Sequence, residues 1–353
     1  MKNAIREARA LLDRLPRARL GFFPTPLHRL DRLSALLGVN LYIKRDDFTG
    51  MNLFGGNKVR KLEYLLGATA ASGVKYAITY GATQSNHAME TAAACRRLGI
   101  TPVLYLTAVV QPDAASLRAN LLLDRVLGAE VHIVPIEPGE TEADAEERSF
   151  RMGAARAEAL NAAGQPCVDI PMGGASELGS VGFAAAMVEL AEQLQELNGL
   201  RFSRIYHSTG TGGTMAGMHA GRALLGMDTA IVSVSASPKD KPSYLKKVYD
   251  LSAAVLDLLG SERRPDPAAM RLNLTQWHPG YEQPNEAATE AILMLAREEG
   301  LFVDPVYTGK ALAGLLADVR SGEIAQGDTV LFWHTGGATA LFAEPEILGG
   351  LCR

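Results

Sequence analysis

Residues 54–65 read Phe-Gly-Gly-Asn-Lys-Val-Arg-Lys-Leu-Glu-Tyr-Leu, so a glycine pair leads directly into a predicted helix. Gly55 and Gly56 let the backbone turn and let another group approach it closely. Lys58 falls in the first turn, where unpaired helix N–H groups create a positive potential that disfavours the ammonium form. A neutral amine at this position would be nucleophilic and would suit a Schiff base. The alternative interpretation is a solvated lysine of the kind that is common near helix starts.

The composition indicates an ordinary globular protein with two lobes. The chain has 353 residues, of which 47% are hydrophobic and 21% are charged, and this length is enough for two separate cores. A net charge of −4 without blocks of like charge predicts that nucleic acid is not a partner. No run approaches the about 18 uninterrupted apolar residues of a membrane span, and the charged segment 1–19 does not resemble a signal peptide. A cytoplasmic protein without membrane contact is therefore predicted.

The cysteines give no sign of a metal site. Cys95, Cys167 and Cys352 include no Cys-x-x-Cys pair and no Cys/His cluster at ligand spacing. The sequence therefore predicts neither a bound metal nor a disulfide framework.

Short apolar runs alternate with helical periodicity along most of the chain, which predicts an α/β protein with parallel sheets. A proline-containing arm at 23–27 is predicted to be extended, and the pattern is least informative over 236–276. Strands are predicted at 41–45, 76–80, 103–106, 131–134, 205–207, 231–235 and 329–334. Helices are predicted at 1–15, 86–98, 115–127, 142–163, 178–194, 214–225, 243–259, 285–299 and 309–319.

Residues 81–87, Gly-Ala-Thr-Gln-Ser-Asn-His, follow a predicted strand and open a predicted helix. Ser85 and Asn86 occupy N-cap positions, and capping alone would explain them. In a parallel sheet, however, ligands bind beyond the carboxyl ends of the strands, which is where this loop must lie. The stretch is therefore a candidate binding loop.

Residues 208–214, Ser-Thr-Gly-Thr-Gly-Gly-Thr, also lie between a predicted strand and a predicted helix. Glycine-rich loops in this position expose backbone N–H groups to an anion, and the threonine hydroxyls add donors. The stretch predicts a phosphate-binding loop without a lysine. A dinucleotide site is the alternative, with Asp228 at a suitable distance, but the third glycine of that motif is missing.

Three further stretches place hydroxyl or aromatic residues at expected sheet ends. Residues 304–310 (Asp-Pro-Val-Tyr-Thr-Gly-Lys) and 332–337 (Phe-Trp-His-Thr-Gly-Gly) are each predicted to begin at a strand end, where a planar ring fits. Residues 279–286 contain Tyr281 in a predicted loop. Plain strand-to-helix turns and an exposed loop tyrosine are the alternatives.

These stretches together resemble the pyridoxal-phosphate (PLP) enzymes of the D-cysteine desulfhydrase and 1-aminocyclopropane-1-carboxylate (ACC) deaminase family. The resemblance extends from Thr25 to about Leu341. The matching segments are Thr-Pro-Leu at 25–27, Lys-Arg-Asp-Asp at 44–47, Gly-Gly-Asn-Lys at 55–58 with the Arg-Lys-Leu-Glu-Tyr that follows, Gln-Ser-Asn at 84–86, and the later glycine and tyrosine motifs.

The resemblance implies the tryptophan-synthase β-like fold (PLP fold type II), an α/β fold with two open, twisted parallel-sheet domains that carry helices on both faces. The smaller domain would comprise residues 55–163 with the lysine helix. The larger would comprise 1–54 and 164–353 with the phosphate loop. The resemblance also implies pyridoxal 5'-phosphate between the domains, a small amino acid as the substrate and, commonly, a homodimer.

The resemblance also assigns roles to individual residues. Lys58 would hold PLP, Tyr307 would approach the substrate, and Thr308 would meet the pyridine nitrogen. A neutral hydroxyl there would not keep the ring protonated, which suits expulsion of a good β-leaving group. The implied catalytic residues are Lys58, Ser85, Tyr307 and Tyr281. The implied cofactor-binding residues are Lys58, Asn57, Asn86, Thr209, Gly210, Thr211, Gly212, Gly213, Thr214, Thr308 and Thr335, and the implied substrate-binding residues are Ser85, Asn86 and His87.

Within the family, His87, Thr308 and Thr335 resemble the desulfhydrase branch, since ACC deaminases typically have glutamine, glutamate and leucine there. The resemblance thus implies α,β-elimination from D-cysteine to pyruvate, hydrogen sulfide and ammonia. L-cysteate, with loss of sulfite, and ACC are alternative substrates, and a catalytically silent PLP- or nucleotide-binding protein is an alternative of another class. Met89-Glu90 and Glu282 depart from the family pattern, and these departures bear on the substrate.

Overall fold

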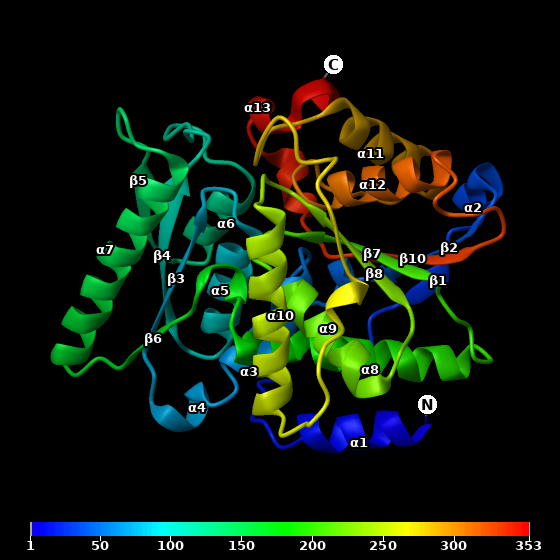
Figure 1. Ribbon diagram of the computed structural model, residues 1–353. Helices are drawn as coiled ribbons and strands as arrows, with labels where there is room; N and C mark the ends of the chain where they lie inside the picture. Colours follow the sequence, from blue (N-terminus) through cyan, green and yellow to red (C-terminus); the bar gives the residue numbers. More distant parts are fainter. Residues whose placement is uncertain (1, 353) are drawn as a thin grey trace.

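The computed structural model describes residues 2–352, and its larger sheet has six strands (Figure 1). The strand order is β1-β2-β10-β7-β8-β9. Neighbouring strands run parallel except for β1, which pairs antiparallel with β2 at the edge. The bounds are β1 Leu27–Arg29, β2 Asn40–Arg45, β7 Arg204–Thr209, β8 Ala230–Ser235, β9 Met270–Asn273 and β10 Thr329–His334.

Helices cover both faces of this sheet because its strands are apolar on both sides. In β10, Leu331 and Trp333 pack toward one helical layer, whereas Val330 and Phe332 pack toward the other. The first layer contains α1 (Lys2–Leu12), α8 (Glu177–Glu196) and α9 (Gly213–Leu225), with α10 (Lys241–Leu258) beside α9. The second contains α2 (Asp31–Leu37), α11 (Glu286–Glu299) and α12 (Thr308–Arg320).

The smaller sheet has four parallel strands in the order β5-β4-β3-β6. Its strands are β3 (Tyr76–Ala82), β4 (Thr101–Ala108), β5 (Glu130–Pro135) and β6 (Cys167–Asp169). Ile78 and Val103 pack toward α7 (Glu142–Ala162), which crosses the outer face in Figure 1. The other face is covered by α3 (Asn57–Leu65), α5 (Asn86–Arg97) and α6 (Ala119–Val126). The remaining elements are α4 Thr69–Ser72, α13 Pro345–Leu348, and the 3₁₀ turns η1 Asp46–Phe48, η2 Met172–Gly174, η3 Pro267–Ala269, η4 Ala338–Phe342 and η5 Gly349–Cys352.

The observed elements agree with the predicted α/β alternation, with six additional strands and helices. Sequence patterning did not predict β1, β6, β9, α2, α4 or α13. A prediction that proved wrong is the strand end at Asp304, because the residues between α11 and α12 form turns and irregular backbone. Strand β6 pairs with β3 in the smaller sheet, beyond residue 163. The division of the chain into domains at residues 55 and 163 stays a prediction.

Within residues 2–352, no helix is both long and apolar enough to cross a membrane.

Candidate active site

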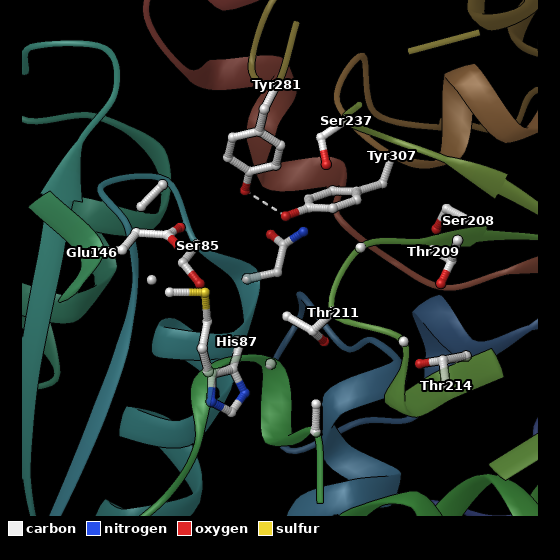
Figure 2. A pocket seen from close by; sticks show the side chains of 18 of the residues that line it. Ser85, His87, Glu146, Ser208, Thr209, Thr211, Thr214, Ser237, Tyr281 and Tyr307 are labelled. Atoms are coloured by element: carbon white, nitrogen blue, oxygen red, sulfur yellow. Dashed lines mark hydrogen bonds between the residues drawn. The ribbon is translucent and has the colours of Figure 1, made fainter. Parts of the chain in front are cut away.

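A cavity of about 860 Å³ opens where the carboxyl ends of strands from both sheets meet. Ala82 is the last residue of β3 and Thr107 the last but one of β4 in the smaller sheet, and Thr209 ends β7 of the larger one. Figure 2 shows Ser85, Tyr281, Tyr307 and the threonines of residues 209–214 around this space. The sequence-predicted residues that line it are Asn57, Lys58, Ser85, Asn86, His87, Thr209, Gly210, Thr211, Gly212, Thr214, Tyr281, Tyr307 and Thr335.

Lys58 lies in the first turn of α3 and opens into the cavity. Its Nζ donates a hydrogen bond of 2.9 Å to Asn57 Oδ1. Burial lowers the pKa of Lys58, although Glu90 and Asp304 act in the opposite direction. Burial is therefore the main cause that favours the neutral amine of Lys58.

Ser85 is the N-cap of α5, and its Oγ accepts a hydrogen bond from Ala88 N at 3.2 Å. Gly81 permits this position, because a Cβ atom at Gly81 would overlap the Ser85 side chain. Asn86 is held through its Oδ1, which accepts from Asn120 Nδ2 at 2.7 Å and from Thr339 Oγ1 at 3.2 Å. The predicted capping and the predicted place at the cavity are thus both observed.

His87 is buried against the smaller sheet, with Nε2 2.8 Å from Thr79 Oγ1. Burial, together with the charges of Lys58 and Lys61, places the pKa of His87 well below its ordinary value. His87 is therefore a neutral imidazole at physiological pH. Its other nitrogen, Nδ1, makes no hydrogen bond of normal geometry with the described residues.

The glycine-rich loop 209–214 leads from β7 into α9. Gly212, the N-cap of α9, has φ 98°, a left-handed conformation that glycine adopts at least cost. Tyr244 of α10 fixes the loop by donating to Gly210 O at 3.0 Å and by bonding to Thr209 Oγ1 at 2.7 Å. Thr214 Oγ1 accepts from Asn57 Nδ2 at 3.0 Å, which joins the loop to the lysine helix.

Lys61 lies beside the predicted phosphate loop, whose own residues 208–214 include no lysine. Its side chain is 1% exposed, its Nζ donates to Gly173 O at 2.9 Å, and a Cβ atom at Gly213 would lie 3.0 Å from that Nζ. Burial, and then the charge of Lys58, lowers the pKa of Lys61 well below its ordinary value. An anion in the loop would favour the ammonium form, so these residues fit a phosphate group. Helical spacing puts Lys61 one turn beyond Lys58, but only the fold brings it to the loop.

Tyr281 and Tyr307 are hydrogen-bonded through their hydroxyl groups (Figure 2). Their ring centroids lie 5.8 Å apart at an angle of 66°. Burial raises the pKa of Tyr281 well above its ordinary value, and burial also raises the pKa of Tyr307. Both phenols are thus protonated at neutral pH.

Two predicted site residues do not line the cavity. The Thr308 hydroxyl is bonded to the buried Asp304 carboxylate, and Gly213, within the loop, is packed against Lys61, Ala175 and Ser180. Thr335 does line the cavity, with Oγ1 3.0 Å from Ser208 Oγ. The sequence expectation placed Thr308 at the pyridine nitrogen, but it is Thr335, predicted only as a cofactor-binding residue, that lies on the cavity wall.

The described residues contain no cluster of histidine, cysteine, aspartate or glutamate that could hold a metal ion. The cavity instead contains the amine of Lys58, the glycine-rich loop 209–214 with the buried Lys61 beside it, and several neutral hydroxyl groups. Fold and cavity together are those of an α/β enzyme whose cavity between two sheets fits a phosphorylated organic cofactor.

Comparisons identify the family. The sequence profile described as "Pyridoxal-phosphate dependent enzyme" matches residues 18–336, and the chain belongs to this family of PLP-dependent enzymes. D-cysteine desulfhydrase of Salmonella newport is 38% identical over 338 residues, which cover 94% of this chain and 97% of the relative. A Pyrococcus furiosus protein with the provisional name 1-aminocyclopropane-1-carboxylate deaminase is 35% identical, with 95% and 96% covered.

Solved structures give the same fold. The crystal structure of an ACC deaminase homologue matches with a TM-score of 0.83 and 34% identity, covering 95% of this chain and 96% of that one. Threonine deaminase isoform 2 from Solanum lycopersicum matches with a TM-score of 0.65 at 17% identity, covering 96% and 85% of the two chains, which shows the fold alone. The resemblance to the desulfhydrase and ACC deaminase family and the tryptophan-synthase β-like fold are thereby confirmed, as is PLP as the cofactor.

Proposed function

We propose that this protein is a lyase that removes a sulfur-containing β-substituent from a small amino acid, with D-cysteine as the first choice. The net reaction converts D-cysteine and water into pyruvate, hydrogen sulfide and ammonia. The observation that carries the proposal is the bonded pair Tyr281 and Tyr307 in the same cavity as Lys58. Phenols that remain protonated at neutral pH can give a proton to a departing sulfur. The name of the Salmonella relative supports the same choice.

The residues fit PLP, and each has a proposed task. Lys58 would carry the cofactor and then, as a neutral amine, take the hydrogen from the substrate Cα. Loop 209–214 and Lys61 would hold the phosphate, and Thr335 would lie at the pyridine nitrogen. When bound, PLP withdraws electron density from Cα and so makes that hydrogen more acidic.

The substrate would lie on the side of the smaller sheet. We propose that Ser85 and Asn86, at the start of α5, bind the substrate carboxylate, since unpaired N–H groups at a helix start favour an anion. His87 is their buried neighbour, and its contact with Thr79 holds the start of α5 against β3. Tyr307 and Tyr281 then face the β-substituent.

A substrate panel tests the proposal. PLP-loaded protein is given D- and L-cysteine, D- and L-serine, β-chloroalanine, L-cysteate and ACC, and keto acid, sulfide and sulfite are measured. We expect the highest kcat/KM with D-cysteine, with equal amounts of pyruvate and sulfide. Preferential sulfite release from L-cysteate, or keto acid from ACC, would make that compound the substrate instead. No keto acid from any compound would favour the silent binding protein.

We also propose a cytoplasmic homodimer. Within residues 2–352, Cys95, Cys167 and Cys352 are unpaired, as is usual in a reducing compartment. Large apolar side chains such as Leu53, 92% exposed, and Phe342, 65% exposed, suit burial against a second copy. Light scattering coupled to size-exclusion chromatography tests the dimer, and a single mass near 37.7 kDa would contradict it.

A further inference from the structure

Glu90 lies beneath the first turn of the helix that carries Lys58. It belongs to α5, yet its Oε2 accepts a hydrogen bond from Val59 N of α3 at 2.9 Å, and its side chain is 2% exposed. The N-cap residue of α3 is Gly56, which has no side chain to accept from the helix N–H groups. Glu90 therefore provides, from a different helix, the cap that the sequence of α3 lacks.

The space for this carboxyl group comes from Gly56. A Cβ atom on Gly56 would overlap Glu90 Oε1, so any other residue would displace the carboxyl group. Gly56 is itself fixed by a β-bridge to Gly336, and the next residue, Asn57, donates through its backbone N to Thr335 O at 3.0 Å. The carboxyl group is thus held in one place beside the start of the lysine helix.

We propose that Glu90 is a positioning residue for Lys58: its carboxyl group fixes the start of the lysine helix and, once ionised, retains the proton on the amine. This inference rests on the proposed role of Lys58 as the cofactor-bearing lysine. Glu90, which lies outside the cavity wall, would thereby set the pH range over which the Lys58 amine is unprotonated.

The charges around the pair give the direction of the effect. Burial raises the pKa of Glu90 to about 8, with Lys58 acting in the opposite direction. Burial lowers the pKa of Lys58, while Glu90 and Asp304 raise it. Asp46 also raises the pKa of Glu90, and the pair in turn acts on its ionisable neighbours, since the charge of Lys58 lowers the pKa of Lys61 and of His87.

The sign of the pH effect follows from the neutral and charged forms of Glu90. Well below pH 8 the carboxyl group is protonated, carries no charge and leaves Lys58 to be governed by burial. Above about pH 8 the carboxylate attracts the proton on the amine, so Lys58 loses that proton at a higher pH than it would alone. The two groups should titrate as a coupled pair in two steps.

Competitive labelling of the cofactor-free protein tests this directly. Lys58 is acetylated with acetic anhydride between pH 6 and 10, and its labelling is followed by peptide mass mapping. Glu90→Gln keeps an oxygen that can accept from Val59 N but removes the charge. We expect equal Lys58 labelling in the wild type and Glu90→Gln at pH 6.5, and several-fold faster labelling in the variant at pH 9. Glu177→Gln, an exposed first-turn glutamate of α8, is the matched control and should follow the wild type.

A second readout uses the loaded enzyme. Turnover that depends on the neutral amine should rise with pH in both proteins, and this rise should lie at lower pH in Glu90→Gln than in the wild type. Identical pH profiles of Lys58 labelling in the two proteins would overturn the proposal. If Glu90→Gln does not fold, the pH profile of Lys58 labelling in the wild type tests the proposal by itself. A profile with a single titration step would exclude a coupled partner and overturn the proposal. The labelling needs no substrate, so failure of the D-cysteine proposal would leave its result intact.

Discussion

At the scale of single residues, the site depends on two lysines with different surroundings. Lys58 opens into the cavity and bonds to its neighbour Asn57, whereas Lys61 is enclosed between Gly173 O and the phosphate loop. Burial lowers the pKa of both side chains. A covalent task suits the accessible amine, and an electrostatic task suits the enclosed one, where a bound phosphate would restore the charge.

Replacing Lys58 and replacing Lys61 should therefore have different effects on the bound cofactor. Lys58→Ala is expected to lose the visible absorption band that borohydride removes from the wild type. Lys61→Met should keep the band but bind PLP about 10- to 100-fold more weakly, since a hydrogen bond to a charged group contributes about 1.5–3 kcal/mol. Fluorescence titration of the cofactor-free proteins measures the affinities, with the exposed Lys75→Met as the control. Loss of the band in Lys61→Met and its persistence in Lys58→Ala would exchange the two assignments.

Sequence reasoning found the residues that carry local signals and missed those that depend on distant contacts. Lys58, Ser85 and the glycine loop each stand at a predicted helix start, so their place at the sheet ends followed from the alternation of strands and helices. Tyr244 reaches the site from α10, and no local pattern marks it. Glu90 of α5 stood out only as a departure from the family pattern that bears on the substrate, without a link to the lysine helix. Their roles require the packing of the folded chain.

At the scale of elements, α12 connects the two tyrosines. Tyr307 is its N-cap residue, and Lys310, one turn later, is fully buried. Lys310 Nζ donates to Gly280 O at 2.8 Å and to Ala236 O and Trp277 O at 3.4 Å. One helix start thus carries Tyr307 and holds the loop that carries Tyr281.

Loss of Lys310 should misplace Tyr281 without removing it. We expect Lys310→Met to lower kcat by up to about 10²-fold with a smaller change in KM, since a shift of about 1 Å in a catalytic group has an effect of this size. Lys310→Gln, which retains a donor, should recover part of the loss. Lys246→Met, an exposed lysine of α10, is the control in the same steady-state assay. An unchanged kcat in Lys310→Met would show that the loop is held by other contacts.

Predicted and observed elements differ for a physical reason. Strands such as β3, β8 and β10 are runs of buried residues rich in β-branched and aromatic side chains, which patterning detects. The short strands β1 and β9 have three and four residues, too few for a periodicity. Helix α2 begins without a side-chain cap, so its start carries no signal.

At the scale of the whole molecule, a buried network of charges joins the lysine helix to the larger sheet. Arg60 of α3 donates to Asp46 at 2.7 and 2.8 Å and to Glu189 of α8 at 2.9 Å. Lys44 of β2 bonds to Glu189, and Trp333 of β10 donates to Asp46. Each member is buried, so removing one cation leaves an uncompensated carboxylate.

Arg60→Met should therefore lower the free energy of unfolding by about 3–5 kcal/mol, as measured by urea denaturation. Arg151→Met, which removes an exposed pair with Glu147, should change it by less than about 1 kcal/mol. A similar change in both variants would contradict the importance of the buried network.

The same network makes the free energy of unfolding depend on pH in the acid range. Burial alone would raise the pKa of Glu189, but Arg60 and Lys44 outweigh it and lower the pKa to about 2. A carboxyl group with a lowered pKa stabilises the fold above its ordinary pKa of 4.5, and that contribution is lost as the pH falls toward 2. This part of the acid dependence should be weaker in Arg60→Met.

The β-bridge between Gly56 and Gly336 has a consequence for motion. Together with the Arg60 network, it attaches the start of α3 to the larger sheet through several directional bonds, while the contact of α3 with the smaller lobe is mainly the apolar packing of Val59 and Leu62, beside the bond from Val59 N to Glu90. Apolar surfaces tolerate sliding better than charged hydrogen bonds do. We therefore expect that a rotation of one sheet against the other displaces Ser85 relative to Lys58 and leaves the distance from Lys58 to the phosphate loop nearly constant. The cofactor would stay still while the substrate is brought to it.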